Sequence, residues 1–166
     1  MLRRWIYRVR QFRRALGARP HAADLSVLDR YLTPAERRLF EATAPRDQHH
    51  HLETLRLLAR HGEPSPALAR AALLHDAGKG FIHLHERVLY VLLAAAAPWL
   101  LDLLARREHA GVRGALYRTR HHAHLGAETL RRLGAAAREI ELVARHHDDP
   151  GADAELRALI AADDEA

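Results

Sequence analysis

Cysteine is absent from this chain of 166 residues, and lysine occurs once among its 26 basic residues. Without thiols the protein has no disulfide, no thiolate zinc site and no cysteine nucleophile. Any bound metal must therefore use imidazole and carboxylate ligands, which suits Mn, Fe, Co, Ni, Zn or Mg and argues against structural zinc. The 14 histidines supply imidazole in abundance.

The alternation of polar and apolar residues that is typical of a strand is also lacking. Apolar residues recur instead at helical spacing, and Thr33-Pro34 and Ser65-Pro66 are typical of helix starts. We therefore expect an all-α protein. The predicted helices lie near residues 2–16, 23–31, 34–43, 48–61, 66–76, 84–97, 99–108, 113–133, 136–147 and 152–163.

No apolar run is long and continuous enough for a typical membrane-spanning helix of about 20 residues. The run from Val88 to Ala105 is interrupted by Pro98 and contains Asp102. We expect two short helices that are broken at Pro98 and buried in the core, with a membrane-dipping hairpin as the alternative. With no secretory signal recognised, we expect a cytoplasmic protein.

The formal charge of +5 is concentrated at the N-terminus. Residues 1–20 contain seven arginines and no acid, which leaves 19 basic and 21 acidic residues for the rest. The first segment is predicted to be a basic amphipathic helix, followed by one domain over residues 21–166. The helix can pack on the domain, lie on an anionic membrane surface or contact nucleic acid, which is the least favoured partner because exposed aromatics are few.

The single lysine, Lys79, follows a His75-Asp76 pair in the sequence Leu74-His75-Asp76-Ala77-Gly78-Lys79. An ammonium is a compact point charge, unlike the flat fork of guanidinium, and it suits phosphate oxygens. In a chain that otherwise uses arginine, its retention here indicates a chemical role.

Several polar residues occupy positions where a helix would place its apolar stripe. In the last predicted helix Asp163 follows Leu156, Leu159 and Ile160 at helical spacing, so its carboxylate should point inward. Histidines continue the apolar faces of four other helices in the same way. The inward candidates are His50 or His51, His75, Asp76, His122, His147 with its neighbour His146, and Asp163. Because a divalent cation satisfies such groups together, they predict a metal site.

The order of these residues, with Ala72-Leu73-Leu74-His75-Asp76-Ala77-Gly78-Lys79 around the pair, resembles the HD-domain superfamily of metal-dependent phosphohydrolases over roughly residues 45–164. The resemblance implies an all-helical bundle that binds one or two divalent ions. The ligands of the first ion would be His50, His75, Asp76 and Asp163, with Asp76 able to bridge two ions. His50 fits the family pattern better than His51.

A second ion is also implied by the resemblance. His122, four residues before Gly126-Ala127, and the pair His146-His147 resemble the additional ligands of dinuclear members. The Asp-Gly-x-Gly-Tyr-Pro element of the HD-GYP cyclic-di-GMP phosphodiesterases is missing, and Asp148-Asp149-Pro150-Gly151 stands there. That substrate is therefore not expected.

We expect a phosphohydrolase that cleaves a phosphomonoester or phosphodiester, with a nucleotide as the favoured class, by metal-activated water. Asp76 and Lys79 are the predicted catalytic residues; Lys79, and more weakly Arg120, are predicted to bind the substrate phosphate. The alternative is a non-catalytic metal-binding HD scaffold with a regulatory or membrane-peripheral role through residues 1–20.

Overall fold

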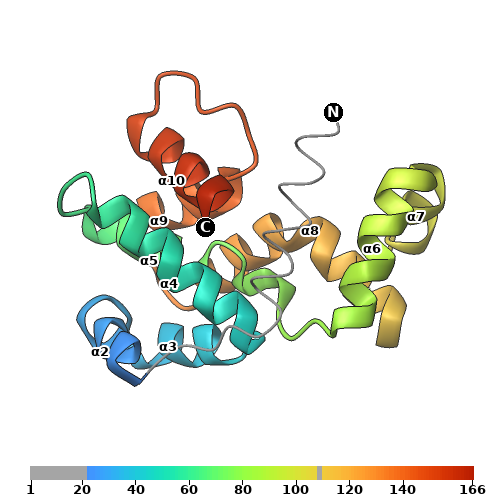
Figure 1. Cartoon of the computed structure of the whole chain (residues 1–166), viewed down its shortest axis with the longest axis horizontal. Helices are drawn as coiled ribbons and strands as arrows, with labels where there is room; N and C mark the ends of the chain where they lie inside the picture. The colour runs from blue at the N-terminus through green and yellow to red at the C-terminus, as the bar shows by residue number, and fades with distance from the viewer. Residues whose placement is uncertain (1–21, 108–109) are drawn as a thin grey trace.

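The computed structural model describes residues 22–107 and 110–166, and these residues form α-helices, one 3₁₀ turn and no strand (Figure 1). The elements are α2 (Ala22–Tyr31), α3 (Pro34–Glu41), α4 (Pro45–Ala59), α5 (Pro66–Leu74), η1 (Ala77–Lys79), α6 (Leu84–Ala96), α7 (Pro98–Leu104), α8 (Gly111–Arg132), α9 (Ala137–Arg145) and α10 (Ala154–Glu165). The all-α prediction is confirmed, and every helix predicted from residue 23 onward has a counterpart. The helix predicted over 2–16 and the basic segment 1–20 lie outside the described residues.

Helix starts follow the local chemistry that the sequence indicated. The Thr33 hydroxyl accepts a hydrogen bond from the Glu36 backbone N–H, and the Glu36 carboxylate accepts one from the Thr33 N–H, which forms a capping box. The Ser65 hydroxyl caps α5 through the Leu68 N–H, and the Asp153 carboxylate caps α10. Each cap satisfies backbone donors that the helix itself leaves free.

The main core lies where α4 and α5 pack on α9 and α10, with α2 and α3 beside α5. Leu73 and Leu74 of α5 are fully buried, as are Leu142 of α9 and Leu159 of α10. Burying one such side chain contributes about 1.5–3 kcal/mol. This packing fixes the helices whose inner faces also present histidine and aspartate.

Two glycines let the turn after α5 approach α8 closely. A Cβ on Gly78 would lie 2.1 Å from the His122 carbonyl oxygen and 2.5 Å from the Gly126 nitrogen. A Cβ on Gly126 would in turn lie 3.3 Å from a methyl group of Val143. Only glycine fits at position 78, so the glycine of the His-Asp-x-Gly-Lys motif brings η1 against α8.

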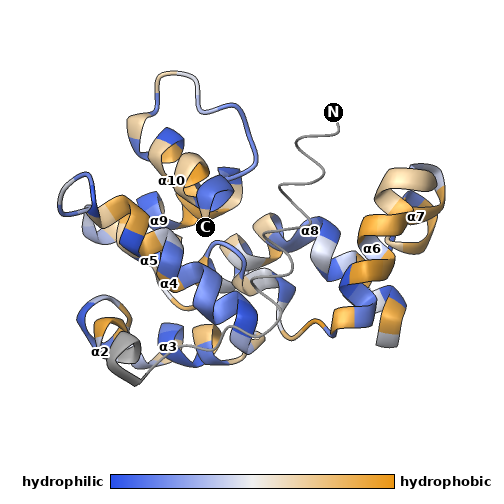
Figure 2. Cartoon of the chain, in the orientation of Figure 1, coloured by the Kyte–Doolittle hydropathy of each residue, from blue (hydrophilic) through white to orange (hydrophobic). Residues whose placement is uncertain are grey.

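Helices α6 and α7 form a hairpin that lies apart from the main core and packs on α8 (Figure 1). The break at Pro98 was predicted correctly, but the expected burial in the core was wrong. A small second cluster of Leu101, Ala105 and Leu116 is buried, while Leu92 and Trp99 are exposed. Figure 2 shows the ribbon of this hairpin coloured mostly as hydrophobic.

Among the described helices, none combines the length and the apolar character needed to cross a bilayer.

Candidate metal centre

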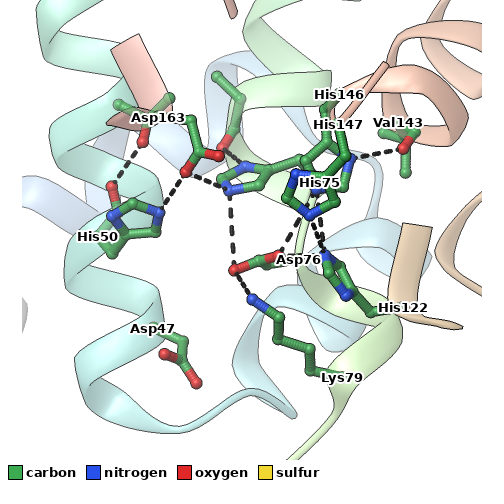
Figure 3. Close-up of polar contacts among 12 residues, drawn as sticks. Asp47, His50, His75, Asp76, Lys79, His122, Val143, His146, His147 and Asp163 are labelled. Carbon is green, nitrogen blue, oxygen red and sulfur yellow. Dashed lines mark hydrogen bonds and ion pairs between the residues drawn. The ribbon is translucent and has the colours of Figure 1, made fainter. Parts of the chain in front are cut away.

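Histidines and aspartates from several elements converge in one cluster, with Lys79 beside them (Figure 3). The members are His50, His75, Asp76, His122, His146, His147 and Asp163. The packing of α4, α5, α8, α9 and α10 brings them together, although they span more than a hundred positions of sequence. Two sets of ligand atoms, one from His122, His146 and His147 and the other from His50, His75 and Asp76, each lie within 4.8 Å of one another. The first half of the centre, as we define it, is His50, His75 and Asp163; the second half is His122, His146 and His147; Asp76 lies between them.

The first half joins α4, the end of α5 and α10. Asp163 Oδ1 lies 2.8 Å from His50 Nε2 and 3.2 Å from His75 Nε2. His75 is fully buried, and Asp163 is half-buried. The inward direction predicted for Asp163 is thus seen in the structure, which also places His50, rather than His51, against it.

The second half consists of three imidazoles whose Nε2 atoms face one another. His122 Nε2 lies 3.1 Å from His146 Nε2 and 3.0 Å from His147 Nε2. His122 and His146 are buried, and His147 lies at the surface. No carboxylate belongs to this half except Asp76.

Asp76 faces both halves with different oxygens. Its Oδ1 lies 2.9 Å from His122 Nε2 and 3.8 Å from His146 Nε2. Its Oδ2 lies 3.8 Å from His75 Nε2 and is paired with the Lys79 ammonium. The carboxylate is therefore placed to share its two oxygens between neighbouring cations.

Lys79 reaches Asp76 because the chain leaves α-helical geometry after α5. The predicted helix over 66–76 ends at Leu74, and Asp76 is the N-cap of η1, which contains Lys79. Residues three apart eclipse one another in a 3₁₀ turn, so the two side chains meet directly. The prediction that Asp76 and Lys79 lie on the same side is confirmed, but the two residues belong to a 3₁₀ turn and not to a continuous α-helix.

Three of the imidazoles are held by backbone carbonyls at their second ring nitrogen. The Nδ1 atoms of His75, His122 and His146 lie 3.0, 2.8 and 2.7 Å from the carbonyl oxygens of Ala72, Thr119 and Val143. Since a carbonyl only accepts, each Nδ1 donates, and each neutral ring presents a lone pair on Nε2. Metal-ligating histidines are oriented in this way.

Electrostatics give the first half a charged character. Burial opposes the imidazolium of His75, but the carboxylates of Asp163 and Asp76 outweigh it and raise the pKa of His75 to about 9. Burial also opposes ionisation of Asp163, yet His75 and the hydrogen bond from His50 hold the pKa of Asp163 well below its usual range. A proton on His75 and the negative charge of Asp163 thus stabilise one another.

The second half has the opposite character. Burial, reinforced by the charge of His75, lowers the pKa of His146 to about 3. Burial and the neighbouring His122 also lower the pKa of His147. These rings are neutral at physiological pH and are ready to donate lone pairs.

The donor set fits a divalent ion. With Nδ1 donating in both rings, the Nε2 atoms of His122 and His146 cannot hydrogen-bond to each other when neutral, although they lie 3.1 Å apart. Two ligands at right angles around an ion, each at about 2.1 Å, are separated by about 3.0 Å. His75 Nε2 is likewise buried without a hydrogen bond, although Asp163 Oδ1 lies 3.2 Å from it. A cation satisfies each of these atoms.

The structure does not bring Arg120 to the centre. Its guanidinium lies 2.6 Å from Asp102 of α7, and it is only two residues from His122, so the two side chains leave α8 on different sides. The physical reason is that α7 supplies a nearer carboxylate. The weaker of the two predicted phosphate contacts therefore lies in an ion pair with the hairpin.

His51, the alternative first-half ligand, is fully buried beside the centre. Its ring packs against His75, with centroids 5.0 Å apart, and against Phe40, and neither ring nitrogen has a hydrogen-bond partner. Burial and the charge of His75 hold the pKa of His51 well below its usual range. His51 thus behaves as an apolar wall behind His75.

Two arginines near the centre were not singled out from the sequence. Arg87 of α6 donates to Asp47 Oδ1 at 2.6 Å, and Arg46 of α4 lies 3.6 Å from the same oxygen. Burial and the neighbouring Arg87 lower the pKa of Arg46, while Asp47 and, to a smaller extent, Asp76 act to raise it. Asp47 is buried, yet its Oδ2 has no hydrogen bond. The sequence places Arg46 and Asp47 one turn before His50, which could have indicated their proximity to the centre. Arg87 lies 40 residues from Asp47 in the sequence, so its contact could not be predicted locally.

Comparisons of the chain with protein-family models, with curated proteins and with solved structures found no match.

Proposed function

We propose that the protein is a metal-dependent phosphohydrolase of the HD type that cleaves a phosphomonoester or phosphodiester, with a nucleotide as the favoured substrate class. One observation carries the proposal: Nε2 atoms of His122, His146 and His147 face one another beside a carboxylate that also faces His75. Such a cluster of lone pairs and carboxylates favours a divalent cation over any arrangement of protons.

The proposed ligands are His50, His75 and Asp163 for one ion, His122, His146 and His147 for a second, and Asp76 for both. The ions would be Mn, Fe, Co, Ni, Zn or Mg. When bound, such an ion acidifies a water molecule toward neutral pH and offsets negative charge on phosphoryl oxygens. The protein's part is to orient the imidazoles so that Nε2 faces the centre, which the backbone carbonyls at Nδ1 accomplish.

Lys79 is proposed to contact a non-bridging oxygen of the substrate phosphate. Its ammonium is mostly buried and is already paired with Asp76, so it stands at the edge of the ligand cluster. Arg46 and Arg87 add positive charge near the same side and balance it against Asp47. Two arginines share the single carboxylate of Asp47, and the excess positive charge supports an anionic substrate such as a phosphate ester.

The test is the metal content of untagged full-length protein that has never met a nickel column, measured by inductively coupled plasma mass spectrometry. We expect one or two equivalents in the wild type and none in Asp76→Ala. Turnover of an aryl phosphate or bis-aryl phosphodiester is then measured on both proteins. Wild-type activity in Asp76→Ala would overturn the proposal.

Metal content without turnover of either ester, followed by failure of a nucleotide screen, would contradict the enzyme and favour a metal-binding scaffold. Absence of metal in the wild type, even after reconstitution with each of the six candidate ions, would contradict the centre itself. Circular dichroism on both proteins establishes that the helical fold is intact in each comparison.

A further inference from the structure

Exposed large apolar side chains are concentrated in one part of the molecule. Of those found in the described residues, only Leu133 lies outside residues 81–112. The others are Phe81, Leu84, Val88, Val91, Leu92, Trp99, Leu103 and Val112, which belong to the α6–α7 hairpin, the segment before it and the first turn of α8. Figure 2 shows the ribbon of the hairpin as mostly hydrophobic, at the right-hand side of the view. Exposed apolar surface gathered in this way marks an interaction site.

The tip of the hairpin is apolar on all sides. No charged residue occurs between Val88 and Leu101 in the sequence. Exposed positions in this stretch are filled by Val91, Leu92, three alanines at 94–96, Pro98 and Trp99. A helix that is apolar all round is normally buried, so this tip requires an apolar phase that surrounds it.

One side of α6 also forms an open groove. Leu84, His85, Val88, Leu89 and Leu92 line it. The groove and the tip are continuous along the helix, so the apolar surface extends from the end of the hairpin toward the segment that follows Lys79.

Positive charge flanks this apolar surface. Arg106 and Arg107 follow α7, Arg113 lies in the first turn of α8, and all three are exposed. Among the described residues from 84 to 113, the acids are Glu86, which is buried and bonded to the His83 backbone, and Asp102, which is paired with Arg120. Residues 103–113 of the sequence hold three arginines and one acid, Glu108, and an apolar element bordered by this net positive charge is complementary to an anionic lipid surface.

We propose that the α6–α7 hairpin is a membrane-docking element that inserts its tip into the interfacial region of an anionic bilayer. At about 1.5 Å per residue, the 13 residues of α6 extend about 20 Å, well short of the ~30 Å hydrocarbon core. The hairpin therefore enters one leaflet and does not span. Trp99, 70% exposed at the start of α7, is suited to the boundary between headgroups and acyl chains.

A second copy of the chain is the other occupant that an apolar hairpin suggests. Two hairpins packed face to face would bury one stripe of each helix and leave the remaining sides polar. The tip instead exposes apolar residues at successive positions 94–96, which lie on different sides of α6. A surrounding fluid phase fits this distribution better than a single flat interface.

The experiment uses the full chain with Trp5→Phe, so that Trp99 is the only tryptophan. Phosphatidylcholine vesicles with and without phosphatidylglycerol are the probes. We expect the emission of Trp99 to shift to shorter wavelength on vesicles containing phosphatidylglycerol and to be quenched by brominated acyl chains. The shift should weaken with added salt, because arginines supply part of the attraction.

Val91→Asp with Leu92→Asp, both at exposed positions, should weaken vesicle binding by at least about tenfold, because two apolar side chains are replaced by charge. Leu133→Asp is the matched control, since Leu133 is 43% exposed against 49% for Val91 but lies at the far end of α8. It should bind vesicles as the parent does. Helical content by circular dichroism should be equal in all three proteins.

An unshifted Trp99 on vesicles that bind the protein would overturn the proposal and assign binding to residues 1–20. Absence of binding would overturn it as well. A dimer in solution that Val91→Asp with Leu92→Asp converts to a monomer, with no response of Trp99 to lipid, would assign the hairpin to self-association. None of these readouts depends on metal content or turnover.

Discussion

The two halves of the candidate metal centre use the same residue type and reach opposite charge states. In the first half, carboxylates on two sides raise the pKa of His75 to about 9, so the ring binds a proton in the absence of metal. In the second half, His146 is equally buried but is surrounded by other imidazoles, and its pKa falls to about 3. The difference shows that burial alone does not decide the state of a histidine; the nearest carboxylate does.

The two charge states predict different metal binding by the two halves. An ion that enters the first half must displace the proton of His75, whereas an ion that enters the second half meets neutral rings. Asp76 connects the two, because Oδ2 faces His75 and Oδ1 faces His122. The strongest test of this picture therefore removes Asp76.

Asp76→Ala should cost both ions and at least about 10³-fold in phosphohydrolase activity, because each half loses its shared carboxylate. Metal equivalents by mass spectrometry and turnover of an aryl phosphate measure the two losses. The matched control is Asp163→Ala, which should empty the first half and leave the second loaded. One equivalent retained in Asp76→Ala would show that Asp76 does not bridge.

His50→Ala and His146→Ala should each remove one ion and leave the other. Activity should fall about 10²-fold or more in both, since one of the two cations that would offset negative charge on the phosphoryl oxygens is lost. Parallel metal analysis at equal protein concentration separates the variants. Simultaneous loss of both ions in either variant would mean that the halves form one indivisible site.

The pH dependence of metal affinity should differ between the two halves, and it can be measured while His75 itself is left in place. The pKa of His75 is raised above that of the unfolded chain, so its charged form stabilises the metal-free protein below pH 6.5, and this contribution is lost as the pH rises through about 9. In His146→Ala, where the first half remains, affinity should therefore rise about 100-fold from pH 6 to pH 8, one proton being displaced per ion.

In His50→Ala, where the second half remains, affinity should change far less over the same interval, because His146 and His147 have lowered pKa values. Titration of each variant with Zn²⁺ against a competing chelator gives both slopes. Equal slopes would contradict the assignment of the proton to His75.

Lys79→Arg should lower turnover about tenfold while the metal content stays at the wild-type value, because the charge remains but the compact ammonium does not. Its side chain touches Asp76 and no other ligand in the described structure. Turnover and metal analysis on the same sample measure both quantities. A parallel loss of metal and activity would place Lys79 in support of Asp76 and not on the phosphate.

Helix positions could be predicted well from this sequence because caps and apolar spacing are local. Thr33, Ser65 and Asp153 each act on backbone groups within three residues. The end of α5 was less predictable, since the turn after it packs on α8 through Gly78, a contact with residues 44 and 48 positions away. The burial of the α6–α7 hairpin was predicted wrongly because apolar composition does not specify what covers it.

The sequence by itself determined the all-helical class, the single lysine after the His-Asp pair and the inward direction of Asp163. Those properties follow from spacing along one helix. Only the tertiary structure decided that Asp163 meets His50 and His75, that Asp76 divides its oxygens between two groups of imidazoles, and that Arg120 pairs with Asp102. The physical reason is that distances across a bundle depend on how helices pack, and electrostatic character depends on those distances.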